Sequence, residues 1–122
     1  MRYMTEWKKK LAMADSNVMK RVLGMLGLAM KAGKVVIGTE QVIAFLQKGR
    51  LKLVLLSGSA SEGTKKKIFH KCEFYKTRTE ELGIDTDELG RLLGKTYTPA
   101  VVGITDENFS RAITNLLDGE NA

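Results

Sequence analysis

The feature of this sequence that most constrains its fold is an almost unbroken apolar run, LKLVLLS, from Leu51 to Ser57. A strand with one face in water alternates apolar and polar side chains, whereas a strand covered on both faces is apolar along its whole length. The run therefore predicts the central strand of a sheet that is covered by helices on both sides.

Helical and strand patterns alternate along the rest of the chain. The order is α-β-α-β-α-β-α-β-α, which predicts an α/β sandwich with helices on both faces of a small sheet. The strand over residues 76–82 is polar, which is typical of an edge strand. The predicted helices cover residues 16–33, 38–49, 59–72, 85–94 and 107–117, and the predicted strands cover residues 34–38, 51–57, 76–82 and 100–105.

The third predicted helix, SASEGTKKKIFHKC, has a recognisable start and inner face. Ser59 and Glu62 have the spacing of a capping box, which predicts that the Ser59 hydroxyl accepts a hydrogen bond from the first turn. Ile68, Phe69 and Cys72 are expected to point into the core.

Length and charge bound the organisation of the chain. A chain of 122 residues fits one domain, which we place at residues 16–118, with an N-terminal extension over 1–15 and a tail over 119–122. Residues 1–79 hold 17 Lys and Arg against 5 Asp and Glu, whereas residues 80–122 hold 3 against 9. A surface this basic usually meets nucleic acid or an anionic membrane. A solvated surface with no partner is the alternative.

Several classes of function lack support in the sequence. No apolar run reaches the roughly 18 residues that a membrane span requires, and no apolar stretch of a secretory signal follows the first lysines. Cys72 is the single cysteine, so no internal disulfide is expected, which suits the cytoplasm. His70 and Cys72 diverge on a helix and no Gly-rich phosphate loop occurs, so we expect no metal, no cofactor and no catalytic residue.

Two segments carry residues suited to contact a ligand. The first is the start of the second predicted helix, Gly38–Gln41, where free backbone N–H groups favour anions and Glu40 can accept hydrogen bonds from a guanine edge. The second is GKTYTP, Gly94–Pro99, in which Tyr97 could stack on an unpaired base. An ordinary capped helix and a plain connection are the respective alternatives. The lysines Lys65–Lys67 spread around their helix, so a solvated face is the default and phosphate contact the alternative.

Four stretches in a fixed order resemble one known family: LGLAMKAGKVVIGTEQV, LQKGRLKLVLLS, SEGTKKKI and ELGRLLGKTYTPAVVGI. From about Asn17 to Leu117 the chain resembles the kink-turn RNA-binding ribosomal protein family (the L-seven-Ae and L-thirty-e types), in particular its short bacterial members. The resemblance implies a three-layer α/β/α sandwich with a four-stranded mixed sheet. It also implies a non-enzymatic protein that binds sharply bent RNA, in association with ribosomes or ribosomal RNA.

The resemblance also implies which residues contact RNA. In the family, the loop that opens the second helix reads guanines, and the loop before the last strand covers a bulged nucleotide. Lys48 lies on the polar face of the same helix. The expected RNA-binding residues of this chain are therefore Lys34, Gly38, Thr39, Glu40, Gln41, Lys48, Lys95, Thr96, Tyr97 and Thr98.

One position departs from the family pattern. Many members carry a lysine where this chain has Ala44, which we expect on an exposed stripe between Glu40 and Lys48. One contact to RNA is then missing. Structured RNA is the expected partner, with ribosomal or other proteins as further candidates. The alternative is a protein-interaction adaptor on the same fold, with the acidic residues 80–88 as its candidate surface.

Overall fold

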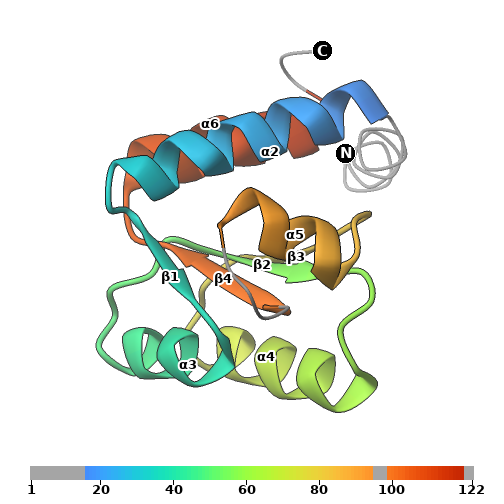
Figure 1. Ribbon diagram of the computed structural model, residues 1–122. Coiled ribbons are helices and arrows are strands. Elements are labelled where there is room, and N and C mark those ends of the chain that lie inside the picture. The colour runs from blue at the N-terminus through green and yellow to red at the C-terminus, as the bar shows by residue number, and fades with distance from the viewer. Residues whose placement is uncertain (1–15, 95–98, 120–122) are drawn as a thin grey trace.

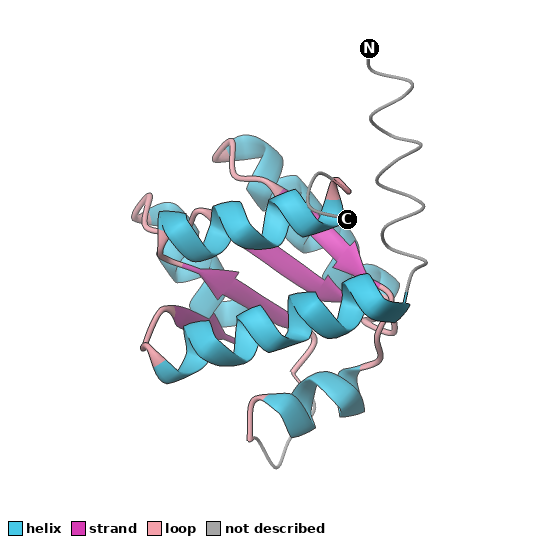
Figure 2. Cartoon of the chain, turned by 90° about the horizontal axis from the view of Figure 1, so that it is seen from above, coloured by secondary structure: helices cyan, strands magenta, loops and turns pink. Residues whose placement is uncertain are grey.

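The computed structural model describes residues 16–94 and 99–119, which form three layers (Figure 1). The elements are α2 (Ser16–Lys31), β1 (Val35–Ile37), α3 (Thr39–Gln47), β2 (Leu53–Ser57), α4 (Glu62–Phe74), β3 (Thr79–Leu82), α5 (Thr86–Leu92), β4 (Val101–Ile104) and α6 (Glu107–Leu117). Helices α2, α5 and α6 lie on one side of the sheet, and α3 and α4 lie on the other. Figure 2 shows α2 and α6 side by side over the strands.

The four strands have the order β1-β4-β2-β3. β4 is antiparallel to both of its neighbours, whereas β2 and β3 are parallel. A parallel pair requires a crossover connection, and α4 supplies it. The predicted α/β/α sandwich with a four-stranded mixed sheet is confirmed, and β3 is the polar edge strand that the sequence predicted.

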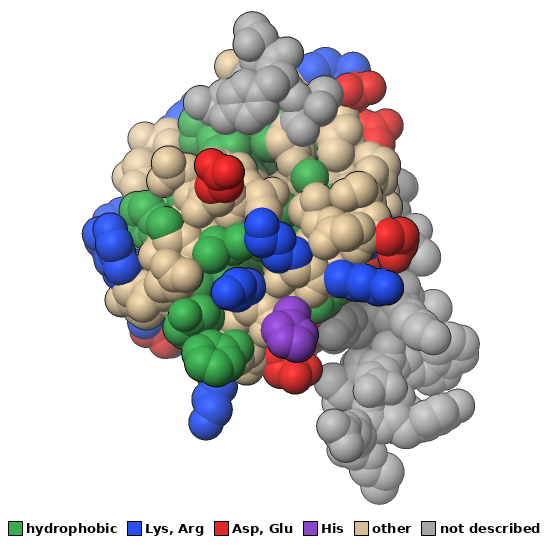
Figure 3. Space-filling view, turned by 90° about the horizontal axis from the view of Figure 1, so that it is seen from below, with side chains coloured by type: hydrophobic (Ala, Val, Ile, Leu, Met, Phe, Trp, Pro, Cys, Tyr) green, Lys and Arg blue, Asp and Glu red, His purple; other side chains and the backbone are tan. Residues whose placement is uncertain are grey.

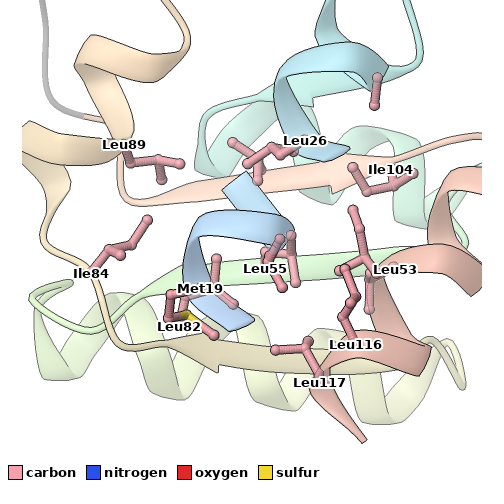
Figure 4. Packing of buried hydrophobic residues seen from close by; sticks show 14 of the residues in the cluster. Met19, Leu26, Leu53, Leu55, Leu82, Ile84, Leu89, Ile104, Leu116 and Leu117 are labelled. Atoms are coloured by element: carbon pink, nitrogen blue, oxygen red, sulfur yellow. The ribbon is translucent and has the colours of Figure 1, made fainter. Parts of the chain in front are cut away.

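β2 is the buried central strand, as its apolar sequence indicated, and all five of its residues are buried. Leu53 and Leu55 face the core under α2, α5 and α6, where Figure 4 shows them near Leu26. Val54 and Leu56 face the second core, under α3 and α4. One strand therefore joins two apolar cores, which is why it contains no exposed position.

The cap of α4 differs from the prediction. The Ser61 hydroxyl, not that of Ser59, accepts the hydrogen bond from the first turn, at 3.2 Å from the backbone N of Thr64. Ser59 is used in a contact distant in sequence, because its hydroxyl accepts from the backbone N–H of Thr86 at 2.9 Å. A capping-box spacing could not reveal this competing partner.

Two further predictions on this part of the chain were wrong. Phe69 does not point inward but is 40% exposed. Ile68 and Cys72 define the inner face of α4, and one residue turns a helix by about 100°, so Phe69 is rotated away from the core. The edge strand is shorter than predicted because Lys76 takes a positive φ of 56°, which turns the chain before β3 begins at Thr79.

The connections of the chain lie at the two ends of the strands, which we call the near edge and the far edge. The near edge holds the segments that follow β1, β2 and β3 and the segment that precedes β4. The far edge, on the left of Figure 1, holds the segments that precede β1, β2 and β3 and the segment that follows β4. Helices α3 and α4 begin at the near edge and end at the far edge. The near edge comprises residues 38, 58–61, 83–85 and 99–100, and the far edge comprises residues 32–34, 48–52, 75–78 and 105–106.

Candidate nucleic-acid interface

Gly38 forms the turn from β1 into α3 at the near edge. Its φ of 100° lies in a region that residues with side chains avoid, so the conformation itself favours glycine. Its N–H donates to the carbonyl of Val101 at 2.9 Å, which ties the turn to the start of β4. A side chain added to Gly38 would meet no described atom within 4 Å. The backbone is therefore open to an approaching ligand.

The first turn of α3 has no side-chain cap, because its N-cap residue is Gly38. The backbone N–H groups of Thr39, Glu40 and Gln41 consequently have no acceptor within the helix, and such groups favour phosphates and other anions. Glu40 and Gln41 are exposed, and Thr39 is half-buried. The turn thus combines backbone donors, a carboxylate acceptor and an amide that both donates and accepts. This combination can recognise a base edge beside a phosphate.

The connection after β2 forms a fixed wall of the near edge. The Ser57 hydroxyl donates to the carbonyl of Ile84 at 3.0 Å, which joins the ends of β2 and β3. The Lys65 ammonium donates to the carbonyl of Gly58 at 3.0 Å and lies 3.5 Å from a Glu81 carboxylate oxygen. Lys65 is therefore a structural residue of the lysine run, whereas the next two lysines are exposed.

The segment that leads into β4 also reaches the near edge. Pro99 is buried, and the carbonyl of Ala100 accepts from the backbone N–H of Ser57 at 2.9 Å. Together with the bond between Gly38 and Val101, this contact places the entry to β4 between the ends of β1 and β2. The expected RNA-binding residues of this segment, which lie outside the described residues, are Lys95, Thr96, Tyr97 and Thr98.

Two expected RNA-binding residues, Lys34 and Lys48, lie away from this group. The carbonyl of Lys34 accepts from the backbone N–H of Thr105 at 3.0 Å, at the far edge. Lys48 is the C-cap of α3, about 13 Å along the helix axis from Thr39 at 1.5 Å per residue. Both lysines are exposed. The sequence order placed them near the turn at Gly38, but a strand and a helix carry them to the opposite edge.

Ala44 is half-buried and not exposed as we expected. Glu40 and Lys48, one turn to either side on the same helix face, are both exposed. A methyl side chain is too short to project past the longer side chains of the neighbouring turns, so it stays partly shielded. The polar stripe of α3 is therefore interrupted at its middle.

Two of the acidic side chains in residues 80–88, the candidate surface of an adaptor, accept hydrogen bonds within the fold. Glu80 is only 5% exposed and accepts a hydrogen bond from the Arg78 Nε at 2.9 Å. Asp85 is the N-cap of α5, since its carboxylate accepts from the backbone N–H of Glu88 at 2.8 Å. These carboxylates are less available to a partner than the sequence suggested.

The described residues do not assemble a catalytic or metal site. Burial raises the pKa of the Cys72 thiol to about 11, so this cysteine is not a ready nucleophile. Within residues 16–94 and 99–119, no group of three His, Cys, Asp or Glu side chains could hold a metal ion. None of the helices in this part of the chain is long and apolar enough to cross a membrane.

The protein is thus a small α/β/α sandwich in which helix α3 begins at a glycine without a side-chain cap. This helix start lies beside the entry to β4, the last strand of the chain. The chain belongs to the ribosomal protein L7Ae/L30e/S12e/Gadd45 family, whose profile matches residues 20–114. The family resemblance that the sequence indicated is confirmed.

Individual relatives support the same assignment. The chain is 42% identical over 94 residues to the RNA-binding protein YlxQ of Bacillus subtilis, a match that covers 77% of this chain and 92% of that protein. It is 35% identical over 79 residues to the large ribosomal subunit protein eL30 of Trypanosoma brucei brucei, over 65% of this chain and 75% of that protein. These relatives bear the names of RNA-binding and ribosomal proteins, in agreement with the expectation of a non-enzymatic protein.

Solved structures show the same fold. A Bacillus halodurans protein with unknown function superposes with a TM-score of 0.73 at 39% identity, covering 80% of this chain and 96% of that chain. A 15.5 kD RNA-binding protein of Giardia lamblia superposes with a TM-score of 0.70 at 12% identity, covering 84% of this chain and 87% of that chain. The second likeness concerns the fold alone.

Proposed function

We propose that this protein is a non-enzymatic RNA-binding protein that recognises kink-turn-like structured RNA at its near edge. The observation that carries the proposal is that the uncapped start of α3 lies beside the entry to β4. The hydrogen bond from the Gly38 N–H to the Val101 carbonyl holds the two together. The relationship to proteins named YlxQ supports RNA as the ligand. A sharply bent RNA presents base edges and phosphates close together, which requires donors and acceptors on adjoining loops.

The near-edge residues divide the recognition between them. The backbone at Gly38 and Thr39 approaches the RNA closely, Glu40 accepts hydrogen bonds from guanine donors, and the Gln41 amide bonds a base edge. The segment with Lys95, Thr96, Tyr97 and Thr98 covers the bulged nucleotide. Its lysine contacts phosphate and its tyrosine stacks on the unpaired base.

The biological setting that we propose is the ribosome or ribosomal RNA in the cytoplasm. The relationship to proteins named as large ribosomal subunit protein eL30 supports this part of the proposal. Sequencing of RNA crosslinked to the protein in cells tests it directly. Enrichment of messenger or transfer RNA without ribosomal RNA would contradict it.

The binding proposal is tested by titrating a labelled kink-turn RNA and a straight duplex of equal length with the protein at two salt concentrations. We expect clear preference for the bent RNA. Gln41→Ala should reduce this preference and leave the salt dependence nearly unchanged. Lys95→Ala should instead flatten the slope of log K against log salt by about 0.7 to 0.9.

Gln47→Ala is the matched control, because Gln47 is an exposed glutamine at the other end of α3. It should leave the preference for bent RNA intact. Equal affinity of the wild-type protein for bent and straight RNA in moderate salt would remove the proposal of shape recognition.

A protein-interaction adaptor is the second candidate, and one surface favours it. An apolar hollow of about 400 Å³ lies between α2 and α6, lined by Arg21, Gly24, Met25, Leu28, Ala112 and Leu116. Leu28, at its border, is 54% exposed. If the titrations show no RNA binding, the wild-type protein should capture a protein partner and the Leu28→Glu variant should not. Capture of the same partner by both proteins would rule out the hollow as the adaptor surface.

A further inference from the structure

The positive charge of the described loops is concentrated at the far edge, opposite the near-edge loops that we propose to contact RNA bases. None of the near-edge residues 38, 58–61, 83–85 and 99–100 is a lysine or arginine. The far-edge segments that precede β1, β2 and β3 contain no acidic residue, and their cations are Lys34, Lys48, Arg50, Lys52, Lys76 and Arg78. Among the described connections, the lysines and arginines therefore lie at the far edge, away from the start of α3.

The sheet places two of these cations on either side of one strand. Lys52 donates its backbone N–H to the carbonyl of Ile104 at 2.8 Å, and Thr105 donates to the carbonyl of Lys34 at 3.0 Å. Both lysines therefore lie beside the end of β4, two strand spacings or about 10 Å apart. Both are exposed, so their ammonium groups can reach phosphates of one nucleic-acid strand.

The other far-edge cations differ in how they are held. Arg78 is occupied, since it donates to Asp118 at 2.6 and 3.1 Å and to Glu80 at 2.9 Å. The Arg50 guanidinium lies 5.0 Å from the centroid of the Phe45 ring, which orients it at the end of α3. Lys76 is exposed and follows the end of α4. Arg50 and Lys76 thus extend the charge from the sheet onto the layer of α3 and α4.

An exposed aromatic ring accompanies this charge. Phe74, the last residue of α4, is 74% exposed. The Phe74 and Tyr75 rings pack in a T-shaped arrangement, with a centroid distance of 4.9 Å and an interplanar angle of 78°. Figure 3 looks onto the α3–α4 layer and shows apolar side chains with Lys and Arg beside them, together with His and some Asp and Glu. Aromatic rings beside cations are the platforms on which unpaired bases stack.

We infer that the far edge binds a single-stranded RNA segment that flanks the kink, with Lys34, Lys52 and Lys76 on its phosphates and Phe74 stacked on one of its bases. Helix α4 spans 13 residues, or about 20 Å, so a strand that leaves the near edge can run along the α3–α4 layer to the far edge. The inference rests on the proposed function for the choice of RNA. An acidic protein at the same surface is an outcome that the experiment separates.

The experiment uses four labelled RNAs: a blunt-ended kink-turn, two versions of it with a uridine tail of about 12 nucleotides at one end or at the other, and the tail alone. The tail should tighten binding by the wild-type protein about tenfold. Lys52→Gln with Lys76→Gln should remove most of this gain and lower the salt slope by about 1.4, since each phosphate contact to a single strand contributes about 0.7. Phe74→Ala should weaken tailed RNA about fivefold with an unchanged slope. Blunt RNA should bind all variants alike.

Lys20→Gln with Arg111→Gln is the matched control, because both side chains are exposed on the opposite layer, on α2 and α6. This pair should leave the gain from the tail unchanged. A tail that adds nothing to wild-type binding at either end overturns the inference, as does an equal loss in the control pair. Loss of a co-purifying acidic protein with no effect on tailed RNA also overturns it. If blunt kink-turn RNA fails to bind while the tail alone binds through Lys52 and Lys76, the proposed function falls, and the far edge is a single-strand site that does not depend on a kink.

Discussion

A single glycine, Gly38, determines what the start of α3 can bind. A serine or aspartate at an N-cap accepts hydrogen bonds from the first turn and so occupies the groups that an external anion would use. Gly38 accepts none with a side chain, and its φ of 100° aims the chain from β1 into the helix. The same residue therefore shapes the turn and leaves its donors available, which neither Ser61 in α4 nor Asp85 in α5 does.

Ala44 offers a test of whether α3 meets RNA. A lysine at this position would pack its stem along the half-buried site and extend its ammonium toward Glu40. We expect Ala44→Lys to tighten kink-turn binding by about 1 kcal/mol, or five- to tenfold, through one added charged contact. Titration at two salt concentrations measures it, and thermal unfolding should show little change. Unaltered affinity at both salts would mean that this face of α3 does not contact RNA.

Because of Cys72, we expect the fold to lose stability at alkaline pH. Its pKa is raised to about 11 in the folded protein from a usual 9.0, so the unfolded chain ionises first as the pH rises. The contribution of the neutral thiol is complete below pH 9 and is lost between pH 9 and 11, at a cost of about 2 kcal/mol by pH 11.

The measurement is the free energy of unfolding in urea at pH 8 and pH 11 for wild type and Cys72→Ala. The alanine variant removes packing at both pH values but also removes the titration. The gap between the two proteins should therefore shrink at pH 11. A constant gap would show that the thiol ionises normally in the fold.

Among the elements, β3 and α6 are joined by one charged side chain. Arg78, just before β3, donates two hydrogen bonds to Asp118 at the end of α6 and one to the buried Glu80. Asp118 raises the pKa of this already strong base, with the cost of its burial opposing and Glu80 adding to the effect. An edge strand of only four residues is thereby tied across the layer boundary.

Loss of this link should destabilise the protein mainly through Glu80. Arg78→Ala removes a guanidinium from a carboxylate that is 5% exposed, and we expect a loss of about 2–3 kcal/mol, since Arg78 itself is 35% exposed. Adding Glu80→Gln to that variant should recover part of the loss. Urea unfolding of the two single variants and the double variant measures the coupling, and strict additivity would show that Glu80 does not depend on Arg78.

For the molecule as a whole, β2 is the element on which both cores depend. Its side chains alternate between the two layers of helices, so a charge placed there has neither water nor a counter-ion. A substitution that disrupts one of the two cores would leave the other core intact only if β2 kept its position in the sheet.

Leu55→Asp should therefore prevent folding. Leu55 is 0% exposed, and burying an unpaired carboxylate costs several kcal/mol, comparable to the whole stability of a domain of this size. Leu28→Asp is the control, because the Leu28 side chain is 54% exposed on α2 and should cost under about 1 kcal/mol. Circular dichroism and thermal unfolding compare them; a folded Leu55→Asp protein with a normal melting temperature would contradict the central position of β2.

The sequence alone determined the order of helices and strands and the central place of β2, because hydrophobic periodicity and uninterrupted apolar runs are local properties that reflect burial. It also indicated the start of α3, since glycine followed by polar residues at a helix N-terminus is a local pattern. Only the tertiary structure decided which serine caps α4, because the hydroxyl of Ser59 is drawn away by Thr86, distant in sequence. Only the tertiary structure separated Lys34 and Lys48 from Gly38, since neighbours along a chain are carried to opposite edges whenever a strand or helix lies between them.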